Sequence, residues 1–275
     1  MGLFYNNDVA GSGISKNSKR KKPFFRFWEL FFRKFGVFFQ VNLIYFLFCI
    51  PVITIGPATA AMTAIMRNIY LERPQFIFHD FKEEFKKNFK QALPIGIIDV
   101  VGIVLSYFAV MYMSNPDVDQ TTRIFAIVGL VAINLLIMVS FYVYPQIVAL
   151  NLKLREIMSN AVLLMFMNPL GDIITFAFFF GYGILLWSFW YVVVFLTPIV
   201  PFAWLCFISV FCCYPTIQKV LINPYYKKTG EKNPEIPEYA EENVFTDLGG
   251  NEQPLEVREQ SAGIANTKKR GKTIK

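Results

Sequence analysis

The sequence is poor in the side chains and motifs on which most enzymes depend. It contains one histidine, His79, and four cysteines that lie in apolar runs without Cys-x-x-Cys spacing. A His-Glu-x-x-His zinc motif, a Gly-x-x-x-x-Gly-Lys-Ser/Thr phosphate loop and a Gly-x-Ser-x-Gly nucleophile motif are all absent from it. These absences predict a protein that is no conventional enzyme and that holds no metal or cofactor. His79 is expected to be solvated or to cap a helix.

Charged residues are also missing from long parts of the chain, a pattern that is not typical of a soluble domain. Of the 275 residues, 55% are hydrophobic and 30 are Phe, which is more apolar surface than polar side chains would readily cover in water. The formal net charge of +7 does not indicate a nucleic-acid partner, because the basic residues flank apolar stretches as they do in cytoplasmic membrane loops. The composition therefore predicts an integral membrane protein.

The apolar stretches predict an all-α, polytopic helical membrane bundle of five to six membrane elements with interfacial amphipathic helices. A helix needs about 20 apolar residues to span a bilayer. Such stretches fall at 35–66, 91–116, 124–152 and 173–218. The last of them contains 46 uncharged residues, which the segment 197–201 divides into two spans.

Outside the spans the composition becomes more polar. Residues 1–23 predict a disordered, basic cytoplasmic tail, 24–222 the helical membrane domain, and 223–275 a second disordered cytoplasmic tail. Residues 24–35 interleave aromatic rings with Arg and Lys, which predicts a helix at the membrane surface in contact with anionic headgroups. Within 67–90, Phe residues recur at three- and four-residue steps opposite Lys and Glu, which predicts a second amphipathic helix.

The distribution of Lys and Arg decides how residues 35–66 cross the bilayer. If this stretch turns back at its prolines, 20 of the Lys and Arg residues near the spans lie inside and only Arg123 lies outside. If it crosses once, the better orientation places 12 inside and nine outside. The positive-inside rule therefore predicts a hairpin with both termini in the cytoplasm. Small residues in its returning helix, Gly56, Ala60 and Ala64, favour close packing against a neighbour.

The turn of this hairpin is a candidate site, formed by Pro51, Thr54, Gly56 and Pro57. Pro57 suits the first position of the returning helix, where its missing N–H costs nothing. The N–H groups at the start of that helix could bind an anion, as broken helices of transporters do, but a simple re-entrant turn is the favoured interpretation. Whether the return leg, 57–70, spans the membrane or stops as a re-entrant half-helix is left open.

Two short patterns recur at similar offsets along the chain. Pro94-Ile95-Gly96 resembles Pro169-Leu170-Gly171, and Phe141-x-x-Tyr144-Pro145-x-Ile147 resembles Phe211-x-x-Tyr214-Pro215-x-Ile217. They are consistent with a parallel repeat of 74–151 and 152–223, in which each unit is an interfacial helix followed by a helical hairpin. Parallel repeats occur in transporters, but plain duplication and chance produce such matches as well, so these interpretations stay open.

Two longer motifs resemble those of a known family. They are Pro51-Val52-Ile53-Thr54-Ile55-Gly56-Pro57-Ala58 and Phe81-Lys82-x-x-Phe85-Lys86-Lys87-Asn88-Phe89-Lys90-Gln91, and they are similar to motifs of the YesL-like family of bacterial membrane proteins. The resemblance covers residues 24–222 and implies an integral membrane protein of Gram-positive bacteria without an assigned activity. It also implies a genomic association with sugar-uptake transporters, polysaccharide-degrading enzymes and sensor kinases. It supplies no catalytic residues.

Asp99 is the one ionisable residue expected deep within a span, which makes it the candidate intramembrane polar site. It shares a helical stripe with Gly96, Gly102 and Ser106 and should therefore face the bundle. Asn42 and Asn134 are the expected polar partners there. An acidic side chain in a membrane is by default a hypothesis of function, here a proton or cation site. The favoured alternative is a protonated or hydrogen-bonded Asp that holds helices together.

These observations predict a membrane protein of undefined activity in the bacterial plasma membrane. The favoured hypothesis is a non-enzymatic accessory or regulatory component of carbohydrate uptake or utilisation, based on the resemblance and on large interfacial surfaces. Its partners would be anionic lipid headgroups and a sugar transporter complex or sensor kinase. The alternative is a small ion-coupled permease that uses Asp99, with the broken first hairpin and the repeat in its favour.

Overall fold

A computed structural model describes most of the chain, and every regular element in its described residues is a helix, which confirms the all-α prediction. The described residues are 22–191, 197, 201–231 and 233–235. The chain divides into two compact units, Met1–Gln218 and Lys219–Lys275, and each is described by itself. Most of both predicted tails, at 1–21 and 236–275, lies outside the described residues.

The first unit begins with two helices that meet at a sharp bend. α1, Pro23–Arg33, and α2, Phe35–Phe48, are bent by 70° at the break between them. α1 begins at a proline, which suits a first helical position. Its rings are largely exposed on one side, while Phe27 stacks on Phe207 at 5.2 Å between ring centroids. This amphipathic, aromatic helix is the one predicted from residues 24–35.

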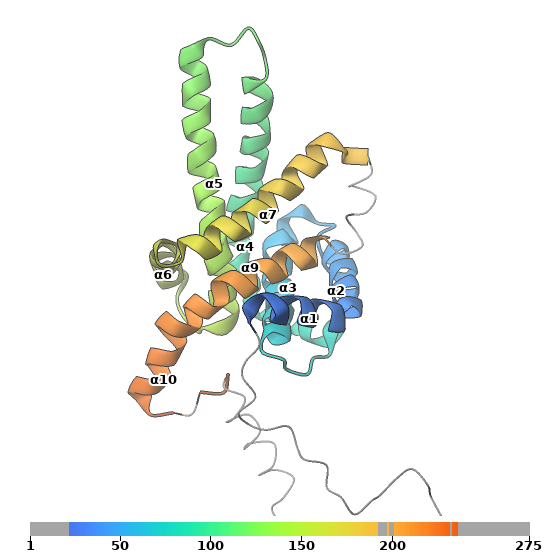
Figure 1. Ribbon diagram of the computed structural model, residues 1–275, viewed down its shortest axis with the longest axis vertical. Coiled ribbons are helices and arrows are strands. Elements are labelled where there is room, and N and C mark those ends of the chain that lie inside the picture. The colour runs from blue at the N-terminus through green and yellow to red at the C-terminus, as the bar shows by residue number, and fades with distance from the viewer. Residues whose placement is uncertain (1–21, 192–196, 198–200, 232, 236–275) are drawn as a thin grey trace, which may run out of the picture. The chain divides into compact units, whose positions relative to one another are not determined.

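α3, Ile55–Tyr70, is the central helix of the unit (Figure 1). A short 3₁₀ turn, Val52–Thr54, joins it to α2. Twelve of its sixteen residues are buried, and it packs against α4, α5 and α9. Its many small side chains allow these three helices to approach its backbone closely.

α4, Ile77–Met113, is one continuous helix of 37 residues. The expectation that an amphipathic surface helix ends before a separate span near Pro94 is therefore wrong. A proline removes one backbone hydrogen bond, but no glycine or turn residue precedes it here to end the helix. The predicted amphipathic pattern is present, since Phe81 is fully buried while Lys82 and Lys86 are exposed; Phe78, however, is exposed as well.

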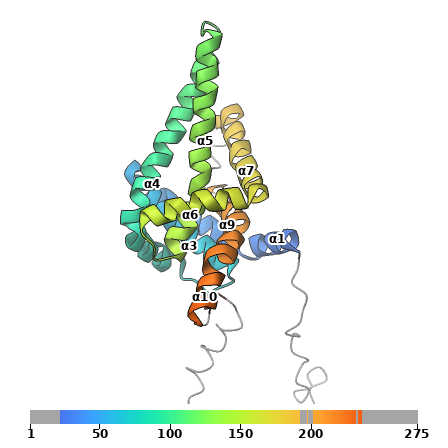
Figure 2. The same ribbon diagram turned by 90° about the vertical axis from the view of Figure 1, so that its left-hand side faces the viewer.

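α5, Gln120–Ala149, returns beside α4, and the two helices run together away from α3 (Figure 2). Asp119 caps its first turn by accepting hydrogen bonds from the N–H and the hydroxyl of Thr122, which hold the pKa of Asp119 below its usual value. Ten consecutive residues near its other end, 139–148, are all buried. The outer half of the α4–α5 hairpin is largely exposed and apolar.

Beyond α5, the described residues of the unit form α6, Leu154–Met167, α7, Pro169–Ser188, and α9, Pro201–Ile217. Asn168 forms the junction of α6 and α7: its side chain accepts from Gly171 N–H at 3.3 Å and donates to the Cys212 carbonyl of α9 at 3.0 Å. A Cβ on Gly171 would lie 2.8 Å from Cγ of Asn168, so a larger residue there would displace the Asn168 side chain from this junction. The described helices of the two predicted repeat units are α4 and α5 in the first and α6, α7 and α9 in the second, and the repeat itself stays a prediction.

Within the described residues, four helices are long and apolar enough to cross a membrane. They are α4, α5, α7 and the helical run Pro201–Thr229, which begins with α9 and continues past its end. The bent pair of α1 and α2 makes a fifth if the two helices form one span. The structure therefore gives four such helices, or five with the bent pair, against a prediction of five to six membrane elements. α3, with 16 residues, is too short to span on its own.

The second unit contains a short helix where a disordered tail was predicted. π-helical turns at Gln218–Ile222 lead into α10, Asn223–Thr229. Proline lies at the start of α10, and Gly230 ends it in the left-handed conformation with φ 74°. These two residues are typical start and stop signals of a helix, so the prediction of disorder from residue 223 onward was wrong for this segment.

Candidate functional site

Asp99 lies on α4 and faces α5, where two hydroxyl groups bind its carboxylate. The Ser140 hydroxyl donates to Oδ1 at 2.6 Å, and the Tyr144 hydroxyl donates to Oδ2 at 2.8 Å. Ser140 and Tyr144 are one helical turn apart on α5, which lets both reach the same acid. Both donors are buried and Asp99 is half-buried. Each carboxylate oxygen of Asp99 therefore has a donor within the protein.

The predicted stripe on α4 faces neighbours within the bundle as expected, with Gly96 against α3 and Gly102 against α5. A Cβ on Gly102 would lie 3.2 Å from Cγ2 of Ile133 on α5, so this face of α4 is in close contact. Ser106 continues the stripe, and its hydroxyl is enclosed without a partner among the described residues. It lies two turns beyond Asp99 on α4, or about 10 Å along the axis, and does not join the carboxylate.

The two asparagines predicted to meet Asp99 bind elsewhere, so that prediction was wrong. Asn134 donates to the Leu130 carbonyl of its own helix at 2.8 Å. Asn42, which is fully buried, donates to the Thr197 carbonyl at 2.9 Å and accepts from Ala203 N–H at 3.1 Å. A carboxamide can be satisfied by backbone groups, such as the N–H groups left open in the first turn of a helix. Asn42 in this way caps α9 from another helix.

The turn between α2 and α3 is closed by its own side chain and by packing. Thr54 donates from its hydroxyl to the carbonyls of Phe48 at 2.5 Å and Pro51 at 2.6 Å. Pro51 is exposed, whereas Gly56 and Pro57 are buried. A Cβ on Gly56 would lie 2.8 Å from Cα of Gly96 on α4, so the start of α3 touches the α4 backbone. This packing supports the simple turn rather than an anion site.

The same contact indicates how far the hairpin reaches. Gly56, at the start of α3, is level with Gly96 on α4. From Gly96, α4 continues for 17 residues to Met113, which is about 26 Å at 1.5 Å per residue. The turn of the hairpin therefore lies well short of the far end of α4, which favours a re-entrant half-helix over a full span for α3.

Asp172, on α7, is a second buried acid that the prediction missed. The Tyr142 hydroxyl of α5 donates to its Oδ1 at 2.6 Å, and the residue is only 3% exposed. The predicted span began at residue 173, so Asp172 was counted outside it. One signal was present: Asp172 follows Pro169-Leu170-Gly171 closely, much as Asp99 follows Pro94-Ile95-Gly96.

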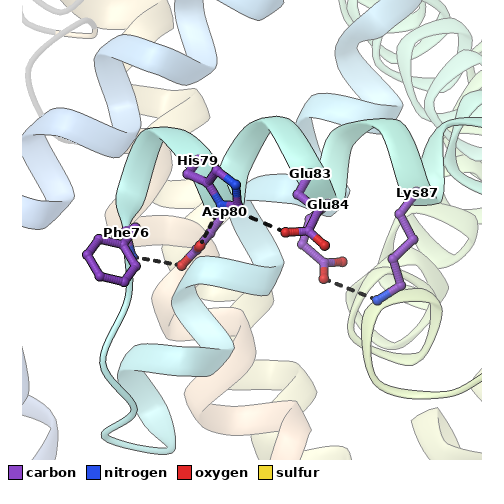
Figure 3. A network of polar contacts seen from close by, with 6 residues as sticks. All are labelled: Phe76, His79, Asp80, Glu83, Glu84 and Lys87. Carbon is purple, nitrogen blue, oxygen red and sulfur yellow. Dashed lines mark hydrogen bonds and ion pairs between the residues drawn. The ribbon is translucent and has the colours of Figure 1, made fainter.

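Acidic and basic residues at the start of α4 form hydrogen bonds and ion pairs along the helix surface (Figure 3). Phe76 N–H donates to Oδ2 of Asp80 at 2.9 Å, which caps the helix. Nδ1 of His79 lies 3.5 Å from Asp80 and 3.8 Å from Glu83, and its side chain is 77% exposed. His79 is thus a solvated neighbour of the capping residue, as expected, and not part of an enclosed site.

Two arginines of α1 are held by the turn that follows α3. Arg33 lies 2.7 Å and Arg26 lies 3.6 Å from the carboxylate of Glu72, and Arg26 also donates to the Tyr70 carbonyl at 2.8 Å. Glu72 has a left-handed backbone, with φ 56°, which is unfavourable for a residue with a Cβ. These contacts fix α1 to α3, and they engage two of the cations that the sequence assigns to lipid headgroups.

Comparison with known proteins adds a family match but no activity. No curated protein and no solved structure matches the chain. The family match covers α4 as far as residue 110 and most of α2, and so includes the re-entrant turn and Asp99. Its description is consistent with the resemblance noted from the sequence and names no substrate. Residues 38–110 match the family described as "Protein of unknown function, DUF624".

Proposed function

We propose that the protein is a non-enzymatic accessory or regulatory component of the bacterial plasma membrane, linked to carbohydrate uptake or utilisation. One observation carries the accessory role: both oxygens of the Asp99 carboxylate are bound by Ser140 and Tyr144. An acid with both oxygens bound inside the protein is suited to holding helices together. The link to carbohydrate is supported by the family resemblance.

The surfaces of the first unit support a role in binding partners. α1 exposes Phe24, Phe25 and Phe32, and aromatic rings of this kind settle at the headgroup level of a bilayer. The exposed lysines at the start of α4 would meet anionic lipid if both termini lie in the cytoplasm. A sugar transporter complex or sensor kinase is the proposed protein partner of the surface that α1 and the start of α4 expose.

The test compares the protein alone with the protein in its native membrane. Crosslinked and solubilised membranes should yield a stoichiometric complex with a sugar transporter or sensor kinase, and purified protein in vesicles should take up neither sugars nor protons. Asp99→Asn should leave the complex intact, as should the control Asp117→Asn in the exposed loop. If the protein alone takes up sugars or protons and Asp99→Asn abolishes that uptake, the accessory role is rejected.

A small ion-coupled permease is the second candidate, and the hydroxyl partners of Asp99 favour it. Serine and tyrosine hydroxyls can both donate and accept, so Ser140 and Tyr144 could pass a proton to or from the acid. The hollow at the outer end of α4, about 620 Å³ in volume, is lined mainly by apolar side chains such as Leu105 and Phe108. It offers no charged group for an ion, which is why the permease ranks second.

A further inference from the structure

α5 carries a tyrosine–carboxylate pair on each of two opposite faces. Tyr144 binds Asp99 of α4, and Tyr142 binds Asp172 of α7. Two residues apart on an α-helix means a rotation of about 200°, so the two tyrosines point away from each other. The acids on the two sides differ in how completely the protein binds them.

Asp172 is enclosed but only half satisfied. Its Oδ1 accepts the hydroxyl of Tyr142, whereas its Oδ2 is buried and has no hydrogen-bond partner among the described residues. Within the same part of the chain, no Lys or Arg forms an ion pair with it. A buried carboxylate with a free oxygen and no counter-charge is strongly disfavoured as an anion.

The described side chains that surround Asp172 carry no positive charge, and the only positive partial charge there comes from the start of α7, in whose first turn Asp172 lies. α5 contributes Tyr142, and α9 contributes the thiols of Cys212 and Cys213, which lie close enough to Asp172 to interact with it electrostatically. On α7 itself the Thr175 hydroxyl donates to the Gly171 carbonyl at 2.9 Å. α6 presents no charged residue from Ile157 to its end.

The position of Asp172 is fixed by the junction of α6 and α7. Asn168 caps α7 and donates to the Cys212 carbonyl of α9, and Gly171 allows the close approach of the Asn168 side chain. Asp172 follows directly, and its N–H donates to the Asn168 carbonyl at 3.1 Å, so the junction fixes the backbone from which the buried side chain extends.

We propose that Asp172 is a proton-binding site, distinct from Asp99. A proton from water forms an O–H bond with a lone pair of Oδ2, and the neutral acid that results keeps its hydrogen bond from Tyr142 at Oδ1. Loss of the proton to water restores the anion. Asp99 differs from Asp172 in having a donor at each oxygen, so of the two acids only Asp172 presents a buried oxygen that is open to a proton.

The test is infrared difference spectroscopy of the full chain in lipid nanodiscs, which detects the carbonyl stretch of a protonated carboxylic acid. At neutral pH the wild-type protein should show one such band, because surface carboxylates are ionised. Asp172→Asn should remove the band, whereas Asp99→Asn and the exposed control Asp117→Asn should keep it. Tyr142→Phe should shift the band to higher frequency, because the acid loses its hydrogen bond.

Three results would overturn the proposal. They are a wild-type spectrum without the band at neutral pH, a band that survives Asp172→Asn, and a band that appears only when sodium is replaced by choline, which would assign the site to a metal cation. If Asp172→Asn does not fold, the comparison of wild type with Tyr142→Phe decides, and an unshifted band rejects Asp172 as its source.

Discussion

Gly56 and Gly96 meet backbone to backbone where α3 crosses α4. A Cβ on Gly56 would lie 2.8 Å from Cα of Gly96, closer than side-chain atoms can approach a backbone without displacement. This crossing places the re-entrant turn against α4 one helical turn before Asp99. The small residues that the sequence places in the returning helix thus have a defined partner.

Adding a methyl group at this crossing should destabilise the protein. Gly96→Ala forces α3 and α4 apart, and overpacking of this kind costs about 1–3 kcal/mol. Thermal unfolding of the purified protein in detergent, followed by tryptophan fluorescence, measures the effect. Gly129→Ala is the matched control, because a Cβ there meets nothing within 4 Å and alanine favours a helix. Equal midpoints for the two variants would contradict the close contact.

Tyr144 and Asp99 should show energetic coupling. Tyr144→Phe leaves Oδ2 of the acid without its donor, and an unpaired buried polar group costs about 1–3 kcal/mol. In an Asp99→Leu background the same substitution should cost much less, since no acid is left unpaired. A double-mutant cycle on thermal unfolding measures the difference, and strictly additive effects would show that the hydrogen bond contributes nothing.

Asn42 should matter more for stability than Asn134. Asn42→Ala removes the carboxamide that binds the Ala203 N–H and the Thr197 carbonyl, and losing such buried hydrogen bonds costs about 1–3 kcal/mol. Asn134→Ala removes only a bond to a carbonyl of its own helix and should change the unfolding midpoint little. The comparison requires both variants in the same detergent, and the ranking fails if Asn134→Ala is the more damaging.

Gln146 should tolerate an apolar replacement better than Gln91 does. Gln146 is fully buried, and its carboxamide has no hydrogen bond among the described residues. Gln146→Met removes that unpaired group at similar volume and should be neutral or stabilising. Gln91 donates to the Leu152 carbonyl at 3.1 Å, so Gln91→Met should lower the unfolding midpoint. A drop for Gln146→Met as large as that for Gln91→Met would indicate a partner outside the described residues.

The cap of α5 should depend on pH in one direction. The pKa of Asp119 is held below its usual value by hydrogen bonds from Thr122, so the cap stabilises the protein above the unfolded-state pKa of about 4. The stability is lost as the pH falls through the lower folded-state pKa. Asp119→Ala should therefore lower the unfolding midpoint at neutral pH, and the difference from wild type should shrink in acid. A constant difference would exclude a charged cap.

Local sequence patterns were sufficient to predict much of the fold. Uncharged length predicted the spans, the spacing of Phe predicted the buried face of α4 at Phe81, and Pro51 with Gly56 predicted the turn. Continuity through Pro94 was not predictable from the change in polarity, because a helix can pass from a wet to an apolar environment without a break. α10 carried readable start and stop signals that the acidic, Pro-rich composition after it concealed.

The site was predicted in part, and the reason lies in sequence distance. The stripe through Gly102 and Ser106 showed that Asp99 faces the bundle, because that information is local to one helix. Its partners, Ser140 and Tyr144, lie 41 and 45 residues away, and only the packing of α4 on α5 brings them together. Asp172 was missed because the start of α7 is set by Asn168 and not by the loss of charge along the chain.

The contacts of Asn42 have a consequence for the order in which the protein is made. Its partners Thr197 and Ala203 follow 155 and 161 residues later in the chain. Because ribosomes synthesise from the N-terminus, α2 enters the membrane long before the helix that it caps has been translated. A chain interrupted before Thr197 therefore keeps a polar carboxamide on α2 without either partner. The last helix of the first unit to be translated, α9, is thus needed to satisfy a side chain of one of the earliest, α2.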